Sequence, residues 1–180
     1  MLGRGAVAVG RGAAKGARPG ADRDGERLVT ITGCSDCHSP KTFTAQGPQP
    51  DASRLFSGHP AGTKLPATPA GLIAPDRWGA LTTNDLTAWS GPWGVSFATN
   101  LTPDPDTGMG SWSEEMFVQS MRTGQHLGTG RPILPPMPWY AYAAMTDEEL
   151  KALFAYLRSL KPIQNAVPDP LPPPGPPPQK

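Results

Sequence analysis

Both cysteines of this 180-residue chain, Cys34 and Cys37, lie three positions apart, and His38 follows the second directly. This Cys-x-x-Cys-His pattern is typical of c-type haem attachment. Two thiols at this spacing can each add across a haem vinyl group, and the adjacent imidazole can bind the iron. The pattern therefore predicts one haem c attached through both cysteines, with His38 as an axial ligand.

Three other readings of the cysteine pair stay as alternatives. A disulfide at this spacing would close a very short loop and stabilise little. A thioredoxin-like redox pair belongs in a βαβ context, and no repeated strand–helix pattern follows the motif. A zinc site needs four ligands, whereas the remaining histidines, His59 and His126, lie far apart in the sequence.

A second axial ligand is predicted at Met137, which lies within the stiff run Pro135–Pro136–Met137–Pro138. Proline fixes φ, and such a run can hold a weakly bound thioether in place. The other methionines, His126 and an open coordination position are the alternatives. With His38 and Met137 both bound to iron, the cofactor would favour one-electron transfer over substrate chemistry.

Two helices with clear boundaries are predicted around these residues. Ser113 is expected to cap a helix that closes at Gly124, with two glutamates in its first turn. Thr146 and Glu149 form a capping box for a second helix, which Pro162 bounds. Its apolar residues recur at helical spacing: Leu150, Leu153, Phe154 and Leu157.

Composition divides the chain into a central domain, residues 24–167, and two tails. Residues 1–23 are rich in Gly, Ala and basic side chains, and residues 168–180 are rich in Pro, so both are predicted to be flexible or extended. Within the domain, residues 57–98 form a long insert without sustained periodicity, apart from short strands around 81–83 and 95–99. We expect this insert to cover the haem and raise its reduction potential by excluding water.

The net charge of +1 does not indicate a nucleic-acid partner, and no apolar run is long enough to span a bilayer. The N-terminal residues also lack the continuous apolar stretch of a secretory signal.

Three segments resemble a known family: GERLVTITGCSDCHSPK, NLTPDPDTGMGSWSEEMFVQSMRTGQH and RPILPPMPWYAYAAMTDEELKALFAYLRSL. They are similar to bacterial class I cytochromes c, and in particular to the cytochrome subunits of membrane-bound alcohol dehydrogenases. The resemblance implies a mainly α fold in which N- and C-terminal helices cross around a covalent haem. It implies close approach of these helices at Gly25, with Leu28 packing against Leu153 and Tyr156.

The resemblance also assigns two further residues to the cofactor site. The carbonyl of Pro48, in a Gly-Pro pair after the attachment motif, would accept a hydrogen bond from His38. Trp112 would lie near the haem edge; its alternative role is that of a packed core aromatic.

The function that follows is electron transfer rather than catalysis, between redox proteins such as a dehydrogenase, an oxidase or another cytochrome. The resemblance places the protein in the periplasm or at the outer face of the inner membrane, so we expect an export signal or anchor upstream of this start. If Met137 does not bind the iron, the alternative is a five-coordinate haem sensor or a peroxide-reducing enzyme.

Overall fold

The computed structural model describes residues 21–173. Most of the predicted N-terminal tail and the end of the C-terminal tail lie outside these residues. The helices are α1 (Ala21–Ile31), α2 (Cys34–His38), α3 (Glu114–Thr123), the 3₁₀ turn η1 (His126–Gly128), α4 (Trp139–Tyr142) and α5 (Asp147–Ser159). The strands are β1 (Lys41–Thr44), β2 (Gly47–Pro50), β3 (Leu81–Thr82), β4 (Ala88–Gly91) and β5 (Gly94–Phe97).

Both helices predicted from their caps are present. The Ser113 hydroxyl accepts a hydrogen bond from the backbone N–H of Met116, and Gly124 ends α3 in the left-handed conformation. The predicted capping box of Thr146 and Glu149 begins α5. These are local signals, and each one specifies a helix end without help from distant residues.

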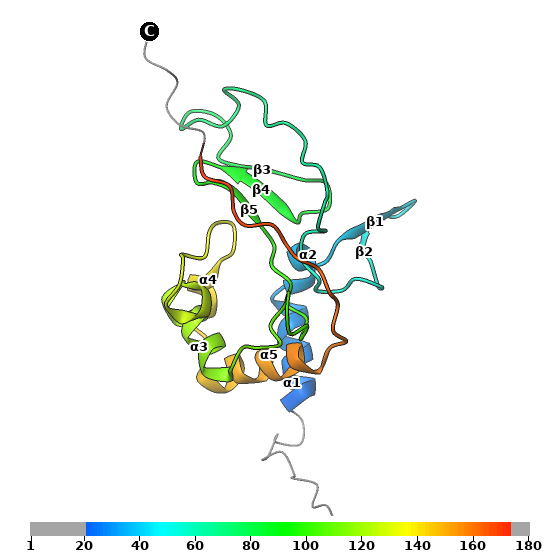
Figure 1. The fold of residues 1–180 in the computed structure, drawn as a ribbon, viewed down its shortest axis with the longest axis vertical. Coiled ribbons are helices and arrows are strands. Elements are labelled where there is room, and N and C mark those ends of the chain that lie inside the picture. Colours follow the sequence, from blue (N-terminus) through cyan, green and yellow to red (C-terminus); the bar gives the residue numbers. More distant parts are fainter. Residues whose placement is uncertain (1–20, 174–180) are drawn as a thin grey trace, which may run out of the picture.

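The core lies where α1 packs against α5, near the bottom of Figure 1. Leu28 and Leu153 are both buried in this core, and Tyr156 packs against it. Gly25 makes the close contact possible, because a Cβ placed there would lie 2.1 Å from the carbonyl oxygen of Ala152. The expected close approach of the two helices at Gly25 is thus present.

The insert contains more regular structure than its sequence predicts. Strands β3, β4 and β5 form an antiparallel sheet in that order, above the helices in Figure 1. The predicted short strands correspond to β3 and β5, but they are not paired with each other. Strand β4, which the sequence did not indicate, lies between them. A separate hairpin of β1 and β2 follows the attachment motif.

A buried hydrogen-bonded chain connects this sheet to the start of the insert. The Thr87 hydroxyl donates to Asp85 Oδ2 (2.8 Å) and accepts from His59 Nδ1–H (2.8 Å). Burial lowers the pKa of His59, whose side chain is almost fully enclosed. Burial alone would raise the pKa of Asp85, but hydrogen bonds from Thr83 and Thr87 lower it. The chain therefore joins a neutral imidazole to an ionised carboxylate.

After α5, the C-terminal segment (residues 160–173) runs from the helices to the edge of β5, as the orange-to-red trace in Figure 1 shows. Two residues of this segment contact parts of the chain that are far away in the sequence. Asn165 contacts residues 57–61, and Leu171 pairs with Val95. Between residues 21 and 173, no helix is long and apolar enough to cross a membrane.

Replacing Gly25 with alanine tests the helix contact. In an open helix this change stabilises by up to about 1 kcal/mol, because alanine has the higher helix propensity. Here we expect it to lower the free energy of unfolding by about 1–3 kcal/mol, since the new methyl group meets backbone that cannot move freely. Denaturant unfolding measures the change. Gly79→Ala is the control, because no atom lies within 4 Å of its added Cβ; a stabilised Gly25→Ala variant would contradict the packing.

The buried imidazole predicts acid sensitivity. Because the folded-state pKa of His59 lies below its usual value of 6.5, the unfolded chain binds more protons, and stability is lost as pH falls through 6.5. His59→Asn keeps a donor for Thr87 but cannot titrate. We expect its free energy of unfolding to decline less steeply between pH 7.5 and 5, by up to about 1.4 kcal/mol per pH unit. Identical slopes for the two proteins would rule out the contribution of His59.

Candidate haem-binding site

The attachment motif occupies a helix of its own. Gly33, in the left-handed conformation at φ 67°, separates α2 from α1. Cys34 and Cys37 are both partly buried free thiols on this helix. Positions three apart on a helix lie on the same face, so the fold presents both sulfur atoms to one side. This is the arrangement that attachment of one planar group through two thioether bonds requires.

A lysine holds the end of this short helix. Lys41 Nζ donates to the carbonyl oxygens of Asp36 (2.8 Å) and Ser39 (2.5 Å), with a longer contact to Ser35 (3.3 Å). A cation at a helix C-terminus satisfies carbonyls that have no partner within the helix and interacts favourably with the helix dipole. Burial lowers the pKa of Lys41, while the charge of Asp36 acts in the opposite direction.

The His38 ring is fixed through one nitrogen. Its Nδ1–H donates to the carbonyl oxygen of Thr99 at 2.8 Å. Burial lowers the pKa of the ring, which favours the neutral imidazole that a metal ion requires. Because Nδ1 carries the proton, the lone pair available to iron is on Nε2. The backbone of His38 is held as well, since its carbonyl accepts from Gly58 N–H (2.8 Å).

The hydrogen-bond acceptor for His38 differs from the prediction. Pro48 is exposed in β2, where it lies opposite Phe43 in the β1–β2 hairpin. Pairing within this hairpin takes the Gly-Pro pair away from the imidazole, and Thr99 supplies the carbonyl instead. The assignment of Pro48 was therefore wrong, although a backbone carbonyl does perform the predicted role.

One thiol has polar neighbours. Cys34 Sγ lies 3.3 Å from the Thr32 hydroxyl and 3.7 Å from the hydroxyl of Tyr142 in α4. Burial, followed by the nearby thiol of Cys34, raises the pKa of Tyr142, so this phenol stays protonated. Burial likewise raises the pKa of Cys37. Tyr142 thus connects the attachment helix to the segment that follows Met137.

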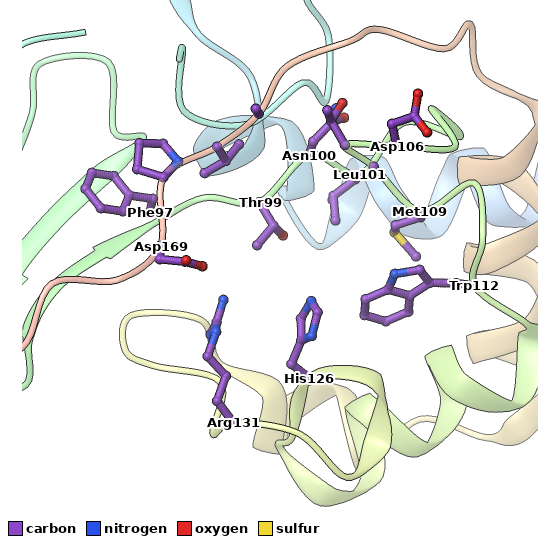
Figure 2. A pocket seen from close by; sticks show the side chains of 15 residues that line it. Phe97, Thr99, Asn100, Leu101, Asp106, Met109, Trp112, His126, Arg131 and Asp169 are labelled. Atoms are coloured by element: carbon purple, nitrogen blue, oxygen red, sulfur yellow. The ribbon is translucent and has the colours of Figure 1, made fainter. Parts of the chain in front are cut away.

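The structure contains a cavity of about 530 Å³, which is shown in Figure 2. This volume is within the range of small-molecule and cofactor sites. Thr99, whose carbonyl holds His38, contributes to its lining. The other lining residues come from the end of β5, the loop before α3, the loop around η1 and the C-terminal segment: Phe97, Asn100, Leu101, Asp106, Thr107, Gly108, Met109, Trp112, His126, Arg131, Ala166, Val167, Pro168 and Asp169.

The predicted residues are distributed unequally around this cavity. Trp112 lines it and packs edge-to-face on His126, with ring centroids 5.1 Å apart. Met137 and the attachment motif are not among the lining residues, although Met137 is partly buried against the core. Phe97 is the contribution of the insert to the lining. The predicted cover of the insert over the haem stays a prediction.

The insert also contacts residues 135–138, which we call the methionine-bearing strip. Ser96 Oγ in β5 donates to the carbonyl oxygen of Pro135 (2.5 Å) and accepts from the Trp93 indole N–H (3.2 Å). Sequence reasoning missed this contact, because a serine in an irregular insert gives no sign of a carbonyl acceptor 39 residues away. A partly buried hydrogen bond from the sheet thus adds to the stiffness predicted for the strip.

Two alternative interpretations of the motif, a disulfide and a zinc site, find no support in the described residues. The two cysteines are not joined in a disulfide. Within residues 21–173, no group of three or more His, Cys, Asp or Glu side chains is arranged to hold a metal ion. The residues of the motif do fit a haem, since they supply two thiols on one helix face and an imidazole whose Nε2 is available, and Thr99 connects them to the cavity.

Comparison with known proteins agrees with this fit. A family model described as Cytochrome c matches residues 23–161, well over half of the sequence. The chain therefore belongs to the cytochrome c family. Membership implies covalently bound haem c and electron transport.

Several curated proteins are similar over less than half of the chain. The cytochrome c subunit of the quinone alcohol dehydrogenase of Gluconobacter oxydans is 35% identical over 81 residues, which are 43% of this chain and 17% of that subunit. The gluconate 2-dehydrogenase cytochrome c subunit of Pantoea cypripedii is 38% identical over 79 residues, 43% and 18% respectively. The fructose dehydrogenase cytochrome subunit of Gluconobacter japonicus is 37% identical over 82 residues, 45% and 17% respectively. The matched stretches thus span less than a fifth of these relatives.

The partly buried hydrogen bond to the methionine-bearing strip can be tested with Ser96→Ala. This change leaves the Pro135 carbonyl and the Trp93 indole without their partner, so we expect a loss of about 1–3 kcal/mol in the free energy of unfolding. Chemical denaturation of the haem-loaded protein measures it. Ser90→Ala in the neighbouring strand is the control, because Ser90 accepts one hydrogen bond at an exposed site. Equal small losses in both variants would show that the Ser96 contact does not hold the strip.

Proposed function

We propose that this chain is a one-electron carrier with a single haem c, attached through Cys34 and Cys37 and ligated by His38 and Met137. The observation that carries this proposal is the attachment helix itself. It presents both thiols on one face, and it ends in an imidazole whose Nδ1–H is donated to Thr99, which leaves Nε2 available. When bound, the haem supplies a couple between ferric and ferrous iron.

His38 is prepared for its role by its surroundings. The hydrogen bond to the Thr99 carbonyl selects the tautomer, sets the plane of the ring and makes Nε2 a better electron donor. The lowered pKa of the ring keeps a competing proton off that nitrogen. This carbonyl contact requires no separate side chain, and it couples the ligand to the loop that lines the cavity.

Met137 is the proposed second ligand, because its strip is stiff and anchored. Three prolines restrict the backbone around it, and Ser96 holds the strip to β5. A thioether ligand favours ferrous over ferric iron and raises the potential. With both axial positions filled by protein groups, iron has no position for substrate, and the chain carries electrons instead of catalysing a reaction.

The proposed partners are redox proteins. The relatives named above are cytochrome subunits of alcohol, gluconate and fructose dehydrogenases, so we infer a dehydrogenase, an oxidase or another cytochrome as donor or acceptor. Exchange of single electrons suits a small, transient interface. Trp112, which lines the cavity, is proposed to lie near the edge of the haem. We place the protein in the periplasm or at the outer face of the inner membrane, following the class of cytochrome that it resembles.

A second function rests on the side chains inside the cavity. His126 and Arg131 project into it from the loop around η1 (Figure 2), whereas Met137 is not among its lining residues. Burial, followed by the charge of Arg131, lowers the pKa of His126, so its imidazole is neutral and able to accept a proton. If Met137 left the iron open, these groups would suit a gas sensor or a peroxide-reducing enzyme.

Absorption spectra of wild type and Met137→Ala, both produced with a haem-attachment system, separate these functions. We expect a low-spin covalent haem with a ferric thioether charge-transfer band that the variant lacks, together with ready binding of carbon monoxide by the ferrous variant alone. Met145→Ala is the matched control, since Met145 is also partly buried against the core.

A high-spin wild-type haem that is unchanged by Met137→Ala would overturn the carrier assignment and favour the second function. Absence of covalent haem in a folded protein would overturn both and return Cys34 and Cys37 to the zinc and disulfide readings.

A further inference from the structure

We propose that Asp169, in the C-terminal segment, lowers the reduction potential of the haem, and that Arg131, which lines the same cavity, raises it. This inference rests on the proposed haem carrier. Residues 168–173 of the segment belong to the predicted proline-rich tail, but the structure makes residues 166–169 part of the wall of the cavity. It would then be a component of the redox site.

The first anchor of this segment is Asn165, which is buried. Its Nδ2 donates to the carbonyl oxygens of Ser57 (2.7 Å) and His59 (2.8 Å), and its Oδ1 accepts from Ala61 N–H (2.9 Å). The neighbouring Ile163 carbonyl accepts from Asn100 Nδ2 (2.8 Å). A buried amide with this many partners fixes the backbone immediately before the cavity-lining residues.

The second anchor lies just after them. Leu171 and Val95 exchange both backbone hydrogen bonds, each 2.9 Å long, so the segment extends the edge of β5. Gly94 permits this approach, because a Cβ there would lie 2.0 Å from the carbonyl oxygen of Leu171. With both ends held, the intervening residues have a defined place along the cavity.

This placement brings a carboxylate to the same cavity as a guanidinium, as Figure 2 shows. Asp169 from the C-terminal segment and Arg131 from the loop after η1 lie at the same end of the cavity in this view, with their charged ends turned toward one another. They are not within ion-pair distance, since the ion pairs within residues 21–173 are Arg122–Asp147 and Lys151–Glu114. Both charges face the cavity without forming an ion pair with each other. Asp106 adds a second carboxylate to the lining, so negative charges outnumber the one guanidinium.

The sign of the effect follows from the charge on the iron. Ferric iron carries one more positive charge than ferrous iron, so a nearby carboxylate favours the ferric form and lowers the potential, and a guanidinium does the opposite. In a partly solvated cavity the interaction between unit charges is stronger than in bulk water. Removing the charge of Asp169 should raise the ferrous-to-ferric ratio at a fixed applied potential by a factor on the order of three to ten.

The test compares midpoint potentials of haem-loaded wild type, Asp169→Asn, Arg131→Gln and the double variant by spectroelectrochemistry at low salt. Asparagine has nearly the shape of aspartate, so the fold should be retained. We expect a higher potential for Asp169→Asn, a lower one for Arg131→Gln, and an intermediate value for the double variant. The control is Asp76→Asn, which removes an exposed carboxylate that does not line the cavity.

A backbone variant tests whether the segment must be docked. Leu171→Pro removes the N–H donated to Val95 at a partly exposed position. We expect it to raise the potential in the same direction as Asp169→Asn, and to add nothing when the two changes are combined.

The outcomes separate this inference from the proposed function. Equal potentials for Asp169→Asn and Asp76→Asn, in proteins whose spectra match low-spin wild type, would overturn the role of Asp169 and leave the carrier assignment intact. An additive shift from Leu171→Pro on top of Asp169→Asn would overturn the role of docking. Absence of covalent haem in the wild type would overturn both the inference and the carrier assignment.

Discussion

The hydrogen bond from His38 Nδ1–H to the Thr99 carbonyl joins the two halves of the site. On one side it fixes the imidazole at the end of α2, and on the other it begins the loop that lines the cavity. The contact can orient the His38 ring because the loop itself is held by hydrogen bonds. Leu101 N–H donates to the Phe56 carbonyl, and the Thr102 hydroxyl is shared with Asn100 and Ile163. The orientation of the His38 ring thus depends on a backbone carbonyl in a loop that is held by segments from different parts of the chain.

The features that sequence predicted well are those whose causes are local. The spacing of Cys34, Cys37 and His38 needs one short helix, and the capping box at Thr146 needs four residues. Gly25 required a family resemblance, because nothing within α1 shows that α5 passes within contact distance of it. Even so, the helix–helix contact could be stated in advance, since both helices carry their own signals.

The features that sequence missed depend on backbone groups or on partners far away. Any residue offers a carbonyl, so neither Thr99 nor Pro135 carries a mark of its function. Pro48 shows the corresponding error: a Gly-Pro pair was matched by type, but pairing with β1 directs it to the surface. The position of Asp169 at the cavity was not predicted, because the prolines on either side of it are typical of an extended tail. The anchors of that segment, Asn165 and Leu171, become visible when the chain is folded.

These nonlocal contacts change the interpretation of the insert. Phe97 is the insert residue that lines the cavity, and the predicted cover over the haem stays a prediction. The insert also contributes a sheet whose last strand contacts two separate segments. Ser96 in β5 bonds to Pro135, and Val95 in the same strand pairs with Leu171. Adjacent residues of a strand point to opposite faces, but their backbones share one rigid ladder. A single strand therefore contacts both the methionine-bearing strip and the C-terminal segment, so a disturbance of β5 would reach Pro135 and Leu171 together.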